Sequence, residues 1–429
     1  MGSDTQIFGD VLTYGHTYYS LSSYNYRNSD WSIILNTCDN VSITGTLKHK
    51  IQTYEKTWYF FSLPFDFKVG DIVTDNDVKF AIRYYDGANR ANTNAAAENW
   101  KNYDNDDIVP AGTGFILQTS ATTWVTFKAQ DNESKQNVMS NSAFEKALAD
   151  NSSEHAAHKG WNLVGNPWQS YYNIHKLNYT APISVWDGRT YAAYSLSDDD
   201  YAIRPNEAFF VQSPGNNTVI SFPVDGRQLT KAITSQNGSR AEASNRQIVD
   251  IQIAGGNELT DKTRLVVNPK ASLGYEISCD ASKFMSMSEQ VPQIYSLGLD
   301  ETQYAINERP ADKGELRLGV VIQQDGQYTI AAIRNSLGKV LLRDNETGIT
   351  TDLSQSGYSF DAKQGTYTAR FVLEFGDGAT AISGMKQAAA EAVSVYTLDG
   401  REVGQTTDGL KPGVYVVRKG QKAQKMIIK

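Results

Sequence analysis

The chain has 429 residues, which is enough for about three domains. Its composition, with 40% hydrophobic, 21% charged and 11% aromatic residues, excludes a disordered, collagen-like or coiled-coil chain. The net charge is −8 and no cluster of basic residues stands out, so we predict that the protein has no nucleic-acid partner. Two cysteines, Cys38 and Cys279, are too few for a disulfide framework, and the sequence leaves open whether they pair.

The sequence contains no run of about 18 apolar residues, so we predict no transmembrane helix. The first residues, Met1 to Asp4, are polar and lack the apolar stretch of a signal peptide. We expect that, if the natural protein is exported, its signal peptide is absent from this sequence.

Turn and strand signals predict an all-β fold. Seven Asp-Gly dipeptides occur in the chain, and several are flanked by alternating or β-branched residues. This dipeptide accepts the positive φ angles of tight hairpin turns. Residues 1–51 are also strand-like, and we expect an N-terminal β segment that forms a unit of its own or belongs to a larger, truncated one.

Two stretches repeat the same landmarks in the same order, which indicates an internal duplication. Each has an aromatic strand ending at a Pro-aromatic pair, then an aromatic-Asp-Gly turn, an Ile-x-Pro step and a Phe-containing strand that ends in Gln. The Asp of the turn follows 28 residues after Trp58 in the first copy and 26 residues after Trp161 in the second. We therefore predict two homologous antiparallel β-modules at 52–130 and 158–233, with the aromatic landmarks in their cores.

Residues 131–157 are expected to connect the two modules. A Ser-x-x-Glu capping pattern at Ser142 predicts a short helix that extends to Ala149. His155 and His158 follow at a spacing that would place two imidazoles on one helical face as metal ligands. Because no third ligand is apparent, we favour the alternative of an exposed polar linker.

A different unit follows the second module. Short strands and regularly spaced turns in 246–375 predict a β-sandwich. The polar stretch 234–245 marks the boundary before it, and the Ala-rich stretch 376–392 is expected to be a linker.

Residues 393–429 have the pattern of a small β-meander, with a hairpin turn at Asp399 and a basic final strand. The pattern V-x-V-Y-x-x-x-G-x-x-V, then L-x-x-G-V-Y-V-V-R, then K-x-I-I-K resembles the C-terminal sorting domain of the type IX secretion system of Bacteroidota. Segments around Trp58 and Gly160 are similar to parts of large surface proteins of that phylum. The resemblance implies export across the outer membrane, with the secretion machinery as a partner and an extracellular or cell-surface location.

The resemblance implies no reaction, and the sequence contains no serine-hydrolase, zinc-protease, nucleotide-binding or Cys-x-x-Cys motif. We therefore predict a protein without enzymatic activity. A carboxylate pair of the glycosidase type leaves no local signature, so it stays open.

Carboxylates cluster in equivalent loops of the two copies. Oxygen ligands on a loop are the ligands that calcium selects. We expect no organic cofactor, and calcium is the candidate ion, although solvated acidic turns are the more common outcome. The candidate ligands are Asp104, Asp106, Asp107, Asp198, Asp199 and Asp200.

Aromatic residues occupy matching turn positions in the two copies. Tyr85 and Asp86 in the first copy correspond to Trp186 and Asp187 in the second. An aromatic ring can stack on the apolar face of a sugar while a neighbouring carboxylate accepts its hydroxyls. These four residues are the predicted ligand-binding residues, and core packing beside a turn is the alternative.

These observations favour a secreted or cell-surface, non-catalytic protein with a role in adhesion, ligand binding or scaffolding. A glycan or a host or surface protein is the expected binding partner. The alternative is a β-rich hydrolase that acts on glycans, or the carbohydrate-binding region that accompanies one.

Overall fold

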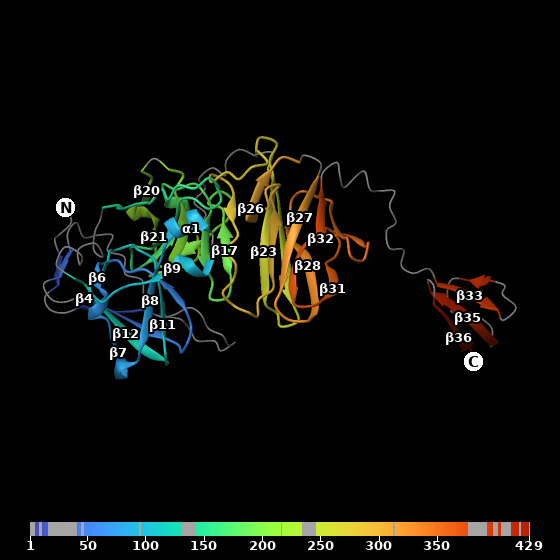
Figure 1. Cartoon of the computed structure of the whole chain (residues 1–429), viewed down its shortest axis with the longest axis horizontal. Helices are drawn as coiled ribbons and strands as arrows, with labels where there is room; N and C mark the ends of the chain where they lie inside the picture. The colour runs from blue at the N-terminus through green and yellow to red at the C-terminus, as the bar shows by residue number, and fades with distance from the viewer. Residues whose placement is uncertain are drawn as a thin grey trace.

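The computed structural model describes most of the chain between Leu47 and Phe375 and shorter pieces on either side. The described residues are 5–7, 11–15, 41–43, 47–93, 96–130, 142–215, 217–233, 246–311, 314–375, 393–397, 402–404, 413–419 and 422–428. Strands dominate these residues, and the all-β prediction is confirmed. Figure 1 shows the first module in blue and cyan, the second in green and the large sheet in yellow and orange.

The first module surrounds a core of aromatic and aliphatic side chains. Its elements are β4 (Leu47–Thr53), β5 (Tyr59–Phe61), β6 (Phe67–Lys68), η1 (Val69–Asp71), β7 (Val73–Thr74), η2 (Asp75–Asp77), β8 (Phe80–Tyr85), α1 (Gly87–Thr93), η3 (Ala96–Asn99), β9 (Trp100–Asn102), β10 (Ile108–Val109), β11 (Phe115–Thr119) and β12 (Thr123–Lys128). The N-terminal strand β2 (Val11–Gly15) joins its sheet β2-β4-β12-β7, and β1 (Thr5–Ile7) pairs with β3 (Val41–Ile43).

The second module has its own core. Its elements are β13 (Phe144–Ala147), β14 (Trp161–Gly165), β15 (Tyr171–Asn173), η4 (Ile174–Lys176), β16 (Ile183–Trp186), β17 (Tyr191–Tyr194), β18 (Ala202–Ile203), β19 (Ala208–Gln212), β20 (Val219–Phe222), η5 (Val224–Gly226) and β21 (Arg227–Gln228).

The two modules have sheets with the same strand order. One sheet runs β5-β11-β8-β9 and the other β14-β19-β16-β17, which is the order first, fourth, second, third in both. The pair β4–β12 corresponds to the pair β13–β20. The segment expected to be a helix from Ser142 to Ala149 is therefore the strand β13, and the helix prediction is wrong. Because its side chains alternate between partly buried and exposed, pairing with β20 prevails over the local capping pattern.

The strands that carry the repeated landmarks are buried on both faces. Odd-numbered residues of β5 and β11, such as Tyr59 and Phe115, point into the first module's core, while Phe60 and Ile116 point outward. Their outward neighbours include Phe210 of β19, in a cluster shared by both modules. Burial on both faces explains why these strands are continuous apolar runs.

Backbone contacts also join the modules. The amide of Gly114 donates to the carbonyl of Leu163 at 3.1 Å, and that of Gly165 donates to the carbonyl of Gly112 at 2.9 Å. A Cβ atom on Gly165 would lie 1.9 Å from the Cβ of Ser62, so glycine is required for this approach.

The third unit, called the large sheet below, is one continuous mixed sheet in the order β30-β29-β32-β27-β25-β26-β23-β22-β28-β31, with β24 paired to β26. Its strands pair antiparallel except β23 and β26, which are parallel. Its strands are β22 (Gln247–Gly255), β23 (Thr260–Val267), β24 (Ala281–Ser282), β25 (Gln293–Leu297), β26 (Gln303–Arg309), β27 (Glu315–Ile322), β28 (Gly326–Asn335), β29 (Val340–Asp344), β30 (Thr350–Asp352), β31 (Tyr358–Ala362) and β32 (Gly365–Phe375).

The large sheet rolls around one core, so its two halves face each other as the layers of a sandwich do. Phe360 of β31 and Phe371 of β32 come from opposite halves, yet their ring centroids are 4.7 Å apart. The guanidinium of Arg370 lies 4.9 Å from the Phe360 ring. Because the sheet rolls up, strands that lie far apart in the strand order contact each other across the core.

The C-terminal strands form a separate sheet in the order β34-β33-β35-β36. They are β33 (Val393–Thr397), β34 (Glu402–Gly404), β35 (Gly413–Lys419) and β36 (Lys422–Ile428). The four expected strands are present, but the meander prediction is wrong in its strand order, because β33 lies between β34 and β35 and pairs with both. In the part of the chain that the structure describes, no helix is long and apolar enough to cross a membrane.

Candidate functional site

The candidate site, called the junction cleft below, is a cleft of about 690 Å³ where the two modules and the large sheet meet. The first module contributes β8, α1 and β9, and Figure 1 shows α1 beside the second module. The segment before β14 contributes two histidines, and the large sheet contributes residues 282–287 and 300–303. The cleft is therefore built from segments far apart in the sequence.

Aromatic rings form one wall of the junction cleft. Tyr85, Trp100, Tyr191 and Phe284 line it. The rings of Tyr85 and Trp100 are 5.2 Å apart, and those of Tyr191 and Phe284 are also 5.2 Å apart. Such a wall can take the apolar face of a ring-shaped ligand.

Arg90 brings a positive charge into this wall from α1. It is only 5% exposed, and its guanidinium lies 5.0 Å from the Trp161 ring and 4.3 Å from the Phe284 ring. It donates to Tyr85 Oη at 3.3 Å and to Ser282 Oγ at 2.9 Å. Among the described residues no carboxylate pairs with it, and its Nε has no hydrogen-bond partner.

Glycine at position 87 allows α1 to dock. A Cβ atom there would lie 2.1 Å from the carbonyl oxygen of Trp161 in β14. Asp86 begins the helix, since its carboxylate accepts the amide of Asn89 at 2.9 Å. The Asp86-Gly87 pair was expected in a hairpin turn and instead starts the helix that holds Arg90.

The two histidines also line the cleft. The ring centroids of His155 and His158 are 5.5 Å apart. Burial, the positive charge of Arg90 and the neighbouring His155 lower the pKa of His158 to about 4, so His158 is neutral at pH 7. Nowhere in the described residues do three or more His, Cys, Asp or Glu side chains gather as a metal site would require.

Two exposed carboxylates, those of Asp300 and Glu301, also line the cleft. Burial tends to raise the pKa of Asp300, but hydrogen bonds from Thr302 outweigh it and lower that pKa. Glu301 forms an ion pair with Arg317. The lowered pKa of Asp300 is the opposite of the raised pKa that an acid catalyst needs.

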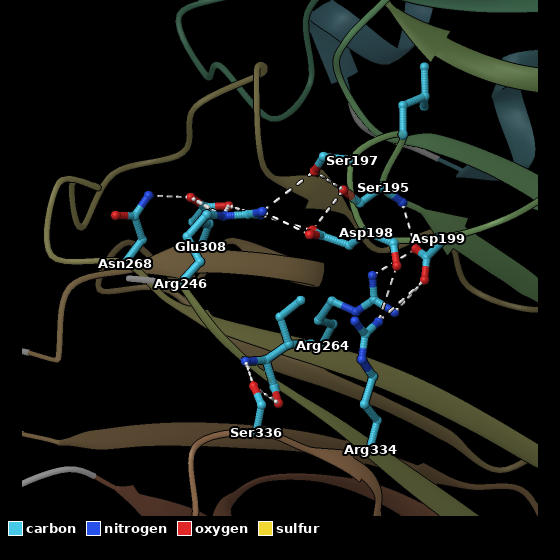
Figure 2. Close-up of polar contacts among 12 residues, drawn as sticks. Ser195, Ser197, Asp198, Asp199, Arg246, Arg264, Asn268, Glu308, Arg334 and Ser336 are labelled. Carbon is cyan, nitrogen blue, oxygen red and sulfur yellow. Dashed lines mark hydrogen bonds and ion pairs between the residues drawn. The ribbon is translucent and has the colours of Figure 1, made fainter. Parts of the chain in front are cut away.

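A buried ion-pair network, called the junction network below, fastens the second module to the large sheet. Figure 2 shows the loop that carries Asp198 and Asp199. It faces arginines of the large sheet and Arg246, which directly precedes β22. Arg264 of β23 contacts Asp199 at 2.7 Å and Asp250 of β22 at 2.5 Å. Arg246 bridges Asp198 at 2.8 Å and Glu308 of β26 at 2.6 Å.

The arginines set the charge of this loop. Burial would raise the pKa of Asp198, but the hydrogen bonds and charge of Arg246 hold it below its ordinary value. The pKa of Arg264 is raised, because its hydrogen bonds to Asp250 and Asp199 outweigh burial. Asp198 and Arg264 are therefore charged at neutral pH.

A second buried ion pair lies beside the junction cleft. Lys283, which follows the cleft residue Ser282, donates to both carboxylate oxygens of Asp261 at 2.7 and 2.6 Å. Thr190 of the second module donates to the same carboxylate at 3.2 Å. The hydrogen bond from Thr190 therefore also links the second module to the large sheet.

Two of the four residues that were predicted to bind a ligand, Tyr85 and Trp186, pack in one aromatic cluster, but only Tyr85 is partly exposed. Tyr85 lines the junction cleft. Trp186 is 4% exposed and packs on Phe60, so it presents no free face to a sugar. Asp187 lies in the turn, where its carboxylate accepts the amides of Arg189 and Thr190. The alternative of core packing holds for Trp186.

The six carboxylates predicted to bind calcium lie in two different settings. Asp104, Asp106 and Asp107 are exposed; Asp106 pairs with Lys68 at 2.7 Å, and Asp107 accepts the amide of Asp104. Asp200 contacts His175 at 2.9 Å, while Asp198 and Asp199 are held by the arginines of the junction network. Calcium binding stays a prediction.

The sequence analysis did not identify Arg90 and Phe284 as residues of the cleft. For Arg90 the sequence did contain one signal. The aromatic-Asp-Gly turn and the Ile-x-Pro step are 22 residues apart in the first copy, from Asp86 to Ile108, and 16 apart in the second. The extra residues form α1 and η3. Phe284 gave no signal, because its role depends on contacts between units.

The fold and the cleft define a multi-module all-β protein with a ligand-sized cleft at the junction of its units. A family model described as a domain of unknown function (DUF8693) matches residues 168–375. This stretch runs from the second module through β32. It therefore includes the residues that the junction network joins, in the second module and in the large sheet.

The chain is also similar to the minor fimbrium subunit Mfa5 of Porphyromonas gingivalis. The two are 31% identical over 125 residues, which is 28% of this chain. The matched stretch covers 10% of that protein, so the chain spans a small part of its length. No solved structure matches the chain.

Proposed function

We propose that this chain is a non-catalytic cell-surface protein that binds a ligand in the junction cleft. The similarity to a fimbrium subunit of a Bacteroidota species supports a surface location and an adhesive or structural role. The observation that carries the binding role is the cleft itself: about 690 Å³ lined by aromatic rings with a few polar and charged groups. This combination is typical of small-ligand sites.

Buried ion pairs support a cleft that exists before the ligand arrives. The junction network and the hydrogen bond from Thr190 to the buried Asp261 hold the large sheet against the second module. Contacts through Gly114 and Gly165 hold the second module against the first. A site formed in advance does not spend binding free energy on ordering its walls.

The binding role is tested by filling the cleft. Thr302 lies at the lip, so Thr302→Trp should block entry, while Thr350→Trp on β30 adds the same bulk outside the cleft lining. Labelled wild-type chain and both variants are applied to arrays of glycans and of surface and matrix proteins. We expect binding that Thr302→Trp removes and Thr350→Trp preserves. Absence of binding, or equal binding by all three chains, would contradict the proposal.

We propose in addition that 393–429 directs export and surface attachment through the secretion machinery. Its support is the ordered terminal motif and the separate four-stranded sheet that it forms. The test is a fusion of 393–429 to a periplasmic reporter in a host with type IX secretion, beside a fusion that lacks the last five residues. Surface exposure of the reporter only in the first fusion is expected. Retention of both in the periplasm would refute the sorting role.

A further inference from the structure

Arg90 differs from the other buried arginines whose partners the structure shows. Arg264 and Arg370 each pair with at least one carboxylate. Arg90 is equally buried, yet its hydrogen-bond partners are two hydroxyl groups and its other neighbours are aromatic rings. Charged side chains are rarely buried without an opposite charge, because desolvation costs several kcal/mol.

The two carboxylates that line the cleft and the one at the start of α1 have other partners. Asp86 caps α1, Glu301 pairs with Arg317, and Asp300 accepts the amide of Thr302. None of them forms an ion pair with Arg90. The described residues therefore leave one buried positive charge at the wall of the cleft without a countercharge.

Resting on the proposed function, we infer that Arg90 anchors the carboxylate of a ligand in the junction cleft. A guanidinium has five N–H donors, and only two hydrogen bonds from Arg90 to protein oxygens are formed. A carboxylate accepts two parallel N–H bonds and supplies the missing negative charge. Ser282 Oγ lies beside the guanidinium and offers a hydroxyl to the same group.

The surroundings select the charge and the body of the ligand. Arg90 supplies one buried positive charge, whereas Arg83 at the same cleft is partly exposed and donates to Asn102, and neutral His158 adds no charge. Asp300 and Glu301 at the lip would repel a doubly charged phosphate more than a monoanion. The rings of Trp100, Tyr191 and Phe284 favour a flat apolar body. The inferred class is a ring-bearing organic acid with one carboxylate.

The main variant is Arg90→Met, which keeps an unbranched apolar side chain between the rings. Because it removes an unpaired buried charge, we expect its melting temperature to equal or exceed that of the wild type. Lys363→Gln, which removes an exposed charge on the large sheet outside the cleft lining, is the control. A lower melting temperature of Arg90→Met would show instead that Arg90 is a structural cation, and would overturn the inference.

Calorimetry with four probes completes the test: hippurate and its amide, and glucuronate and glucose. We expect at least one acid to bind more tightly than its neutral counterpart, with a dissociation constant raised about tenfold or more by Arg90→Met and unchanged by Lys363→Gln. The acid that binds identifies an aromatic or a sugar body. Equal affinity for acid and neutral probe, or no binding of either acid, overturns the inference.

The binding arrays separate this failure from failure of the proposed function. If the acids fail while array binding stays sensitive to Thr302→Trp, the cleft binds a ligand of another class. If array binding is also absent, the proposed function fails as well.

Discussion

Replacing Arg264 with methionine should strongly destabilise the protein, because it leaves the buried carboxylate of Asp250 without its ion-pair partner and leaves Asp199 with only the more distant Arg334, at 3.6 Å. The Arg264 side chain is 4% exposed, and its partners Asp250 and Asp199 are 7% and 14% exposed. Four N–O contacts of 2.5 to 3.0 Å join them. Breaking a buried pair by removing one partner costs about 3–5 kcal/mol. We expect a loss in the free energy of unfolding within this range.

The assay is urea denaturation at pH 7, followed by tryptophan fluorescence. Trp161 and Trp186 lie in the cluster between the modules, which also contains Phe284 of the large sheet, so their fluorescence reports on the junction. If the junction network holds the units together, Arg264→Met should also separate unfolding into two steps. The triple variant Arg264→Met, Asp250→Asn, Asp199→Asn should recover part of the loss, since the stranded charges are removed.

The control is Lys363→Met, which breaks an exposed ion pair with Asp325; Lys363 is 83% exposed. An exposed pair is screened by water, so the urea midpoint should not change measurably. A loss below about 1 kcal/mol for Arg264→Met would refute the reasoning, because it would mean that the carboxylates are hydrated or re-paired at no cost.

Three further predictions follow from the structure. Burial raises the pKa of Asp280 to about 7 from an ordinary value of 3.8, so the native state binds this proton more tightly than the unfolded state does. The free energy of unfolding should therefore fall as pH rises from about 4 to 7, by at most roughly 4 kcal/mol. Urea titrations at several pH values should show that Asp280→Asn flattens this slope. Gly165→Ala should lower the free energy of unfolding by about 1–3 kcal/mol through the clash with Ser62, whereas Gly256→Ala, which meets open space, should not; equal midpoints would contradict the close approach of the modules. Truncation after Phe375 should leave the melting temperature of the remaining chain unchanged, because among the described strands β33 to β36 pair with one another and with no other strand; a lower value in calorimetry would reveal a docking contact.

The aromatic landmarks predicted the strand framework because they serve local packing. Trp161, Phe115 and Phe209 lie on strands whose alternate residues fill a module core and the face between modules. A residue needed on either face of a strand leaves a pattern in one stretch of sequence. This is why the strand regions could be recognised without knowing their partners.

The strand β13 and the boundaries of the modules could not be predicted in this way. The strand β13 is formed by pairing with β20, more than 70 residues later, and the strand β4, which begins at Leu47, pairs with β12. The expected module starts at 52 and 158 therefore leave out most of β4 in the first module and all of β13 in the second. Local capping chemistry favoured a helix, but the strand partner decided the outcome.

The acidic loop of the second module shows the same limit for a site. Asp198 and Asp199 looked like solvated or calcium-binding carboxylates beside an equivalent cluster at Asp104 to Asp107. The first module's loop is exposed, whereas the second meets Arg246 and Arg264 across the junction. Equivalent sequences therefore have different roles, because only one copy contacts the large sheet.

The same asymmetry accounts for the position of the junction cleft. Duplication provides two sheets of the same strand order, and in the second copy a tight turn joins β16 to β17. In the first copy the corresponding turn is expanded into α1 and η3, and α1 docks through Gly87 onto β14 of its neighbour. Arg90 thereby reaches Phe284 and Ser282 of the large sheet. The chemistry of the cleft thus depends on the segment by which the two copies differ, while the segments that they share form the framework.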